Sequence, residues 1–67
     1  MKWKNAKHDD LPLNNQEVLI TVDGINYIAT YDKLNKAFKL NNNPGAVFFA
    51  NKKTIYWMEI VAPEEND

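Results

Sequence analysis

Residues 17–31 read EVLITVDGINYIATY, two runs of alternating apolar and polar residues joined by Asp23-Gly24. A two-residue type I′ turn needs positive φ at both central positions, and Asp-Gly tolerates that conformation. We therefore predict a β-hairpin in which residues 17–22 pair antiparallel with residues 25–31. This register assigns every side chain of the hairpin to one of two faces, so it decides how the rest of the chain must pack.

One face of the predicted hairpin is the expected core. It carries six residues in three cross-strand pairs: Val18 with Ala29, Ile20 with Tyr27, and Val22 with Ile25. The other face is polar except for Leu19 and Ile28, which pair with each other. A sheet with one solvent-exposed face rarely carries such an apolar pair on that face. We expect Trp3, Leu11 or a partner protein to cover it.

The two ends of the chain differ from this central part. Residues 1–16 are mostly polar, and Pro12 holds the residue before it in extended geometry and removes a backbone donor. We expect residues 1–16 to form an extended lead-in that crosses the sheet. Residues 62–67 are an acidic tail, which we expect to fray. The whole chain, residues 1–67, is short enough to form only one domain.

The remaining segments predict further short strands. Residues 37–40 should place Phe38 and Leu40 inward, after a turn in which Asn35 is suited to the left-handed conformation. Pro44-Gly45 fits the centre of a type II turn. Residues 47–50 are apolar but too short to decide between an edge strand and one helical turn. Residues 54–61 are apolar on both sides, which is typical of a central strand or of a closed barrel.

These elements predict an all-β fold, a strongly bent antiparallel meander of four to five strands that resembles a partly open SH3-like barrel. The chain has 67 residues and no cysteine, so no disulfide supplements its small core. Lack of cysteine fits a reducing cytosol, and no apolar run approaches the length of a membrane span. We expect a cytoplasmic protein that does not contact membranes.

The composition also limits the chemistry of the chain. With no serine, no cysteine and a single histidine, one chain cannot assemble a Ser-His-Asp or Cys-His arrangement. Asp9 with Asp10 and Glu64 with Glu65 are neighbouring carboxylates in segments that look exposed, and ordinary carboxylates make poor proton donors near neutral pH. We predict that the protein is not an enzyme and carries no catalytic residue, metal or cofactor.

His8-Asp9-Asp10 is the one stretch where a histidine and carboxylates are neighbours. Imidazole and carboxylate together suit several divalent metals. Neighbouring residues of an extended segment point in different directions, however, and no second histidine or cysteine completes a site. We therefore favour a solvated turn over a metal site.

The order of several landmarks resembles the family called domain of unknown function 551, short proteins frequent in phages and prophages. The resemblance covers nearly the whole chain and rests on these residues: Trp3, Leu11-Pro12, Gln16–Ile20, Tyr31, Tyr56-Trp57-Met58 and Pro63. Tyr56 stands where the family often has histidine, and the proline-rich end of the family is reduced here to residues 59–63. The resemblance implies a compact, mostly β domain of phage or mobile-element origin and implies no activity.

Two kinds of partner remain. The candidate contact surface for a protein partner, or for self-association, combines an apolar pair with a later segment: Leu19, Ile28, Val47, Phe48, Phe49, Lys52 and Lys53. In a strand, Phe48 and Phe49 would point to opposite sides, so one ring would face outward and could join an interface. The alternative is that both rings complete the core.

The second kind of partner is a single-stranded nucleic acid. Lys2, Lys4, Lys52 and Lys53 lie near aromatic residues in the sequence, and small barrels can bind single strands through basic grooves and stacking rings. The net charge of −1 and the absence of arginine argue against this partner. We therefore expect a non-enzymatic protein-interaction module, with nucleic-acid binding as the alternative.

Overall fold

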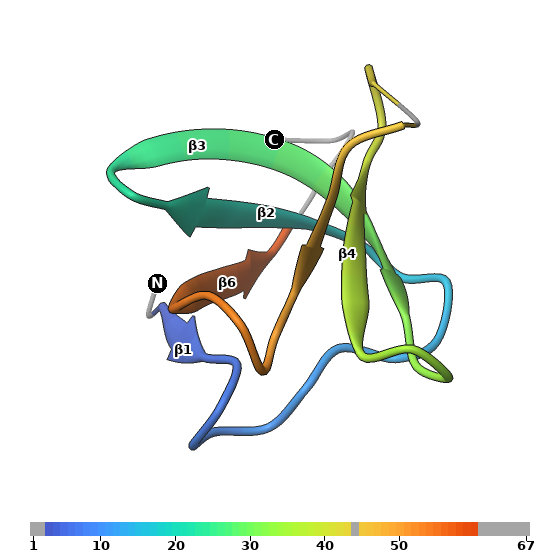
Figure 1. Cartoon of the computed structure of the whole chain (residues 1–67). Helices are drawn as coiled ribbons and strands as arrows, with labels where there is room; N and C mark the ends of the chain where they lie inside the picture. Colours follow the sequence, from blue (N-terminus) through green and yellow to red (C-terminus); the bar gives the residue numbers. More distant parts are fainter. Residues whose placement is uncertain (1–2, 44, 61–67) are drawn as a thin grey trace, which may run out of the picture.

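In the described part of the chain, six antiparallel strands form one strongly curved, open sheet (Figure 1). The computed structural model describes residues 3–43 and 45–60. In chain order the strands are β1 (Lys4–Asn5), β2 (Glu17–Val22), β3 (Ile25–Asp32), β4 (Ala37–Leu40), β5 (Val47–Phe49) and β6 (Ile55–Glu59). The predicted all-β class is confirmed. The sheet has more strands than expected because the lead-in itself contributes β1, which pairs with β6.

The predicted hairpin has the register that the Asp-Gly turn requires. Val18 pairs with Ala29 and Ile20 with Tyr27 across β2 and β3. At the turn, Asp23 has φ of 53° and Gly24 has φ of 81°, so both central residues are in the left-handed region. The turn therefore assigns the faces of both strands as the sequence predicts.

The order of strands across the sheet is β1-β6-β2-β3-β4-β5. The last strand, β6, returns to lie between β1 and β2, so it is an interior strand, as its apolar character on both sides predicts. Residues Val47–Phe49 form the edge strand β5, which decides between the two alternatives for this segment in favour of a strand. β2 through β5 follow one another as a meander.

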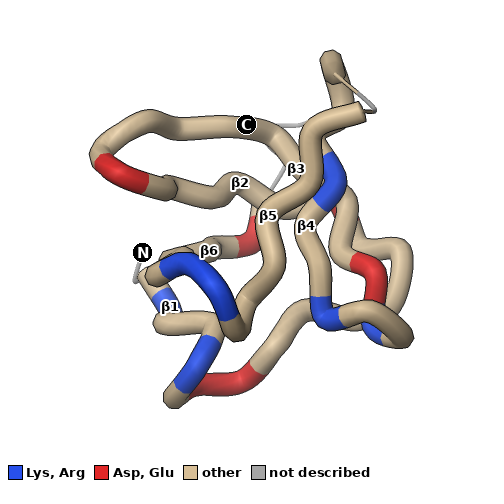
Figure 2. Tube along the Cα trace, viewed as in Figure 1, with Lys and Arg blue, Asp and Glu red and all other residues tan. Residues whose placement is uncertain are grey.

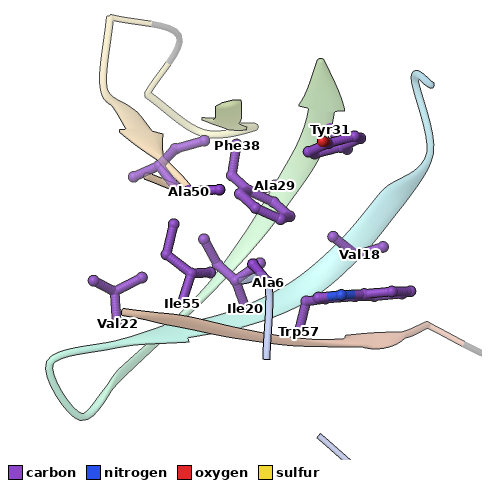
Figure 3. Close-up of a cluster of buried hydrophobic side chains, with 11 residues drawn as sticks. Ala6, Val18, Ile20, Val22, Ala29, Tyr31, Phe38, Ala50, Ile55 and Trp57 are labelled. Carbon is purple, nitrogen blue, oxygen red and sulfur yellow. The ribbon is translucent and has the colours of Figure 1, made fainter. Parts of the chain in front are cut away.

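The concave face of the sheet holds the core (Figure 3). Val18 and Ile20 are fully buried, and Trp57 from β6 is 2% exposed beside them. Tyr31 and Phe38 face each other across β3 and β4, with ring centroids 4.9 Å apart. Aromatic rings bury much area at little entropic cost, which suits a core that no disulfide supports.

The lead-in is held over one end of this core. The indole Nε1 of Trp57 donates a hydrogen bond to the carbonyl oxygen of Asp10 at 2.9 Å, and Pro12 is buried. The Asn15 amide then donates to the Tyr31 carbonyl at 2.8 Å, and the Tyr31 amide donates to the Gln16 carbonyl at 2.9 Å. These bonds continue the ladder of β2 and β3 and lead the chain into β2.

One residue assigned to the core face is exposed. Ile25 pairs with Val22 as predicted, yet its side chain is 55% exposed whereas Val22 is 2% exposed. The reason lies in the neighbouring strands. β6 flanks Val22 through Ile55, but β4 pairs with β3 only from Ala29 onward. Ile25 therefore projects beyond the body of the core at the tip of the hairpin.

The turn between β3 and β4 also differs from the prediction. Lys36, with φ of 51°, adopts the left-handed conformation that we expected of Asn35. Asn35 instead bonds to Asp32 through its side chain at 2.7 Å. The predictions for the Pro44-Gly45 turn and for the tail at residues 62–67 involve positions outside the described residues.

Candidate interaction surface

The residues of the predicted contact surface lie in two separate places. Leu19 and Ile28 lie on the outer face of β2 and β3, opposite the core. Val47 and Phe49 lie on the edge strand β5, followed by Lys52 and Lys53 in the turn that leads to β6. Phe48 belongs to neither place, because its ring points inward.

An apolar row crosses the outer face of three neighbouring strands. Leu19 of β2 pairs with Ile28 of β3 on one side and with Met58 of β6 on the other. Ile28 is 42% exposed, and Leu19 and Met58 are partly exposed. Neither Trp3 nor Leu11 shields the row fully, because Ile28 keeps this exposure and both of those side chains are themselves exposed. We call Ile28, Leu19 and Met58 the outer row.

Further apolar side chains extend the outer row. Alternation along β6 puts Tyr56, which is 40% exposed, on the same face as Met58. Ile60 directly follows β6 and is 45% exposed. Trp3 directly precedes β1, the strand beside β6, and is 40% exposed. Sequence analysis identified Leu19 and Ile28 but missed the contribution of Met58, because only the β2–β6 pairing brings it beside Leu19.

A polar network separates the outer row from β5. The Thr30 hydroxyl donates to the Asn41 side-chain oxygen at 2.8 Å, and the Asn41 amide donates to the Glu17 carboxylate. Lys39 pairs with Asp32 at 3.4 Å on the same side of β3 and β4. Since Thr30 lies between Ile28 and Lys39 in the register, these groups interrupt the apolar surface.

Phe48 and Phe49 point to opposite sides of β5. The ring of Phe48 packs against Tyr27 with centroids 5.4 Å apart and contacts the core cluster. Phe49 faces outward, is 40% exposed, and has the Lys52 ammonium 5.7 Å from its ring centroid. Of the two possibilities for this pair, one ring therefore completes the core and the other is open to solvent.

Lys53 has a different role from Lys52. Its ammonium lies 2.9 Å from the Asp23 carboxylate, so it links the β5–β6 turn to the tip of the β2–β3 hairpin. Both side chains are well exposed, and an exposed pair of this kind contributes little to stability. Among the described lysines considered for nucleic acid, Lys52 lies beside the exposed ring of Phe49, and the Lys4 ammonium lies 4.9 Å from the ring centroid of the buried Trp57.

Asp32 organises the turn between β3 and β4. Its carboxylate accepts hydrogen bonds from the Leu34 amide at 3.1 Å and from the Asn35 side chain at 2.7 Å. The bonds from Asn35 and the nearby Lys39 ammonium hold the pKa of Asp32 below its ordinary value, against the opposing effect of partial burial. Asp32 therefore stays ionised near neutral pH and is unsuited to donate a proton.

Tyr31 lies on the inner face of the same strand as Asp32, and its pKa is shifted in the opposite direction. Its side chain is 1% exposed, and its hydroxyl has no hydrogen-bond partner among residues 3–43 and 45–60. Burial, and secondarily the negative charge of Asp32, raise the pKa of the Tyr31 phenol. An unpaired buried hydroxyl carries a desolvation penalty that no bond offsets.

The His8-Asp9-Asp10 stretch forms a turn after β1. The Asp9 carboxylate accepts a hydrogen bond from the Asn5 amide at 2.8 Å, and the His8 amide donates to the Asn5 carbonyl at 3.2 Å. Together with Trp3 and Lys4 these residues line an open hollow of about 500 Å³. Over residues 3–43 and 45–60, no three metal-ligating side chains gather to hold an ion.

Comparison of the chain with protein-family models, with curated proteins and with solved structures found no match. The resemblance to the domain of unknown function 551 family therefore stays an expectation from the sequence. Within the described residues, no helix has the length and apolar character needed to cross a membrane.

Proposed function

We propose that the protein is a non-enzymatic interaction module that uses the outer row to contact another protein surface. The observation that carries this proposal is the in-register alignment of Ile28, Leu19 and Met58 across β3, β2 and β6 on the face opposite the core. These side chains add little to the core, yet they leave apolar area in water. Contiguous exposed apolar patches on small proteins commonly mark contact sites.

The charge around the outer row favours a protein over a nucleic acid. Residues 17–32 contain no lysine, and Figure 2 shows only acidic positions on the β2–β3 hairpin, toward its ends. A phosphate backbone needs basic side chains along its path. An apolar row without lysine instead resembles the centre of protein interfaces, where charged residues are depleted.

The occupant that we propose is a second copy of this chain. In a two-fold symmetric dimer, a surface packs against an identical copy of itself. A row of side chains that all carry the same charge would therefore face the same charge on the partner. The outer row carries no charged side chain and avoids that penalty. A domain of this size buries only about 60% of the surface that its unfolded chain exposes, so covering the row also adds stability.

Sedimentation velocity over about a hundredfold range of protein concentration tests this proposal. We expect the weight-average mass to rise with concentration in the unmodified protein. Leu19→Lys puts a charge into the centre of the row and should hold the protein monomeric. Leu34→Lys is the matched control, because Leu34 lies in the turn between β3 and β4, outside the outer row, and its side chain is 90% exposed.

Circular dichroism of both variants establishes that they fold. A monomeric mass for the unmodified protein at every concentration would contradict self-association through this face. Equal loss of association in Leu19→Lys and Leu34→Lys would show that the outer row has no special part in it.

One observation favours the second candidate function, binding of single-stranded nucleic acid. Lys52 lies over the exposed ring of Phe49, and a cation beside a stacking platform is a feature of single-strand binders. Fluorescence anisotropy with a labelled oligonucleotide at low salt tests this candidate. If it holds, Phe49→Ala and Lys52→Gln should both weaken binding, and unchanged anisotropy with the unmodified protein would exclude it.

The setting of the protein is also part of the proposal. The absence of cysteine supports a reducing compartment, which we propose to be the cytoplasm. The resemblance of the landmark residues to the domain of unknown function 551 family supports an origin in a phage or mobile element.

A further inference from the structure

A small groove lies at the end of the sheet, away from the outer row. Three segments of the chain meet there: the residues after β1, the turn between β3 and β4, and the turn between β5 and β6 (Figure 1). The groove has a volume of about 210 Å³, and its lining residues are Ala6, Lys7, Leu11, Lys36, Ala50 and Asn51.

The floor of the groove is apolar and continuous with the core. Ala6 and Ala50 are each 6% exposed and both belong to the core cluster. Backbone bonds hold both in place: the Ala6 amide donates to the Ile55 carbonyl at 2.9 Å, and the Ala50 amide donates to the Lys36 carbonyl at 3.0 Å. All six lining residues lie in turns or connecting segments, and these two backbone bonds tie Ala6 to β6 and Ala50 to the turn before β4.

Two lysines line this groove, and no acidic residue among residues 3–43 and 45–60 does. Lys7 comes from the segment after β1 and Lys36 from the turn before β4. The ion pairs among the described residues are those of Lys39 with Asp32 and of Lys53 with Asp23. Lys7 and Lys36 are thus without an acidic partner within that part of the chain, so the groove is lined by two lysines whose charges no described carboxylate neutralises.

The backbone of Lys36 is held in a defined conformation beside the groove. Lys36 has φ of 51°, a conformation that glycine or asparagine adopts at lower cost. Its carbonyl accepts the bond from Ala50, so the conformation is fixed against β5.

We propose that this groove binds a carboxylate side chain of an acidic peptide segment. Its volume is below the roughly 300 Å³ typical of small-molecule pockets, so it offers room for one short side chain. The apolar floor suits the methylene groups of glutamate, and the two ammonium groups suit its charge. Single-stranded nucleic acid fits less well, because none of the lining residues is aromatic and a base would find no stacking platform.

Titration followed by amide chemical shifts in NMR tests this proposal. The probes are the capped tripeptides acetyl-Ala-Glu-Ala-amide and acetyl-Ala-Gln-Ala-amide, which differ in one charge. We expect saturable shifts at the amides of Ala6, Lys7, Ala50 and Asn51 with the glutamate peptide only. Added salt should weaken the binding, because the charges are exposed to solvent.

Substitutions of Lys7 and Lys36 test whether these side chains supply the positive charge that binds the peptide. Lys7→Gln and Lys36→Asn should each weaken binding about two- to five-fold, as expected for exposed ion pairs. Asparagine tolerates the left-handed backbone of position 36, so that variant removes the charge and keeps the turn. Lys33→Gln is the matched control: it lies in the same turn, is exposed, and does not line the groove, so it should leave binding unchanged.

Three results would overturn the proposal. The first is equal shifts with the glutamate and glutamine peptides. The second is unchanged binding in the doubly substituted Lys7→Gln and Lys36→Asn protein. The third is that a short oligothymidylate shifts the same amides at lower concentration than the peptide, which would assign the groove to phosphate.

Discussion

The two faces of β2 carry the same kinds of side chain in opposite surroundings. Val18 and Ile20 point inward and are fully buried, whereas Leu19 between them points outward and is partly exposed. Burial of one aliphatic side chain stabilises a protein by about 1.5–3 kcal/mol, so the inner residues account for folding. The outer row gains much less from folding, although its side chains are equally apolar.

This difference shows how to separate stability from function in a small sheet. A side chain whose burial is complete in the single chain needs no further explanation. An apolar side chain that stays exposed to solvent beside two apolar neighbours lowers solubility and adds little to the core. The comparison therefore predicts that substitutions on the inner face affect unfolding, while those on the outer row affect association.

The largest expected effect is on the inner face. Ile20→Ala should lower the free energy of unfolding by about 2–5 kcal/mol, because the fully buried side chain leaves a cavity lined by packed neighbours. Leu19→Ala should lower it by about 1 kcal/mol or less. Urea denaturation at low protein concentration measures both. Equal losses for the two variants would erase the distinction between the faces.

The turn that sets the two faces comes next. Gly24 has φ of 81°, and a Cβ at this position would meet no atom within 4 Å, so only the backbone conformation opposes a side chain. Gly24→Val should lower the free energy of unfolding by about 1–3 kcal/mol. Gly24→Asn should lower the free energy of unfolding by less, since asparagine tolerates positive φ. Equal stability of the valine variant and the unmodified protein in urea denaturation would argue against the left-handed turn.

Tyr31 tests the inner face with a small change. Tyr31→Phe removes a buried hydroxyl that has no partner in the described part of the chain, so stability should stay constant or rise by about 1 kcal/mol. The raised pKa of Tyr31 also has a consequence for pH. Above the ordinary value of 10.0 the unfolded chain ionises first, so stability should fall as pH rises, and the phenylalanine variant should lose less.

Thermal unfolding at neutral and alkaline pH checks both statements about Tyr31. A lower melting temperature of Tyr31→Phe at neutral pH would indicate that the hydroxyl has a bonding partner in solution.

The smallest effect concerns Asp32 on the outer side. Its pKa is lowered from 3.8, mainly by the bonds from Asn35, so its contribution to stability is present above that pH and is lost as pH falls through the lowered value. Asp32→Asn should therefore reduce the loss of stability that accompanies a fall in pH on the acid side. Melting temperatures between pH 2 and pH 6 measure the slope, and parallel profiles for the two proteins would contradict the assignment.

The sequence predicts the hairpin and its faces because Asp23-Gly24 acts locally. Two residues fix the turn, and alternation then follows along both strands. The exposure of Ile25 could not be predicted in this way, since it depends on where β4 begins to pair with β3. β1 was missed for a related reason: a two-residue strand has no periodicity, and only its pairing with β6 defines it.

The candidate surfaces show the same limit. Leu19 and Ile28 were identifiable because they interrupt a polar face, whereas Met58 joined them only through the β2–β6 register. Likewise, Lys7 and Lys36 are far apart in sequence, and the curvature of the sheet brings them to one groove. Local turn chemistry is readable from sequence, but contacts between distant segments depend on the whole topology.

Solvent paramagnetic relaxation of the methyl groups, measured at low and at high protein concentration, tests the contrast between the faces most directly. The Val18 and Ile20 methyls should be shielded from a soluble paramagnetic agent at both concentrations. The Leu19, Ile28 and Met58 methyls should be accessible in dilute solution and become shielded in concentrated solution. Unchanged accessibility of the outer row at both concentrations, or access of the agent to Val18 and Ile20, would contradict this account.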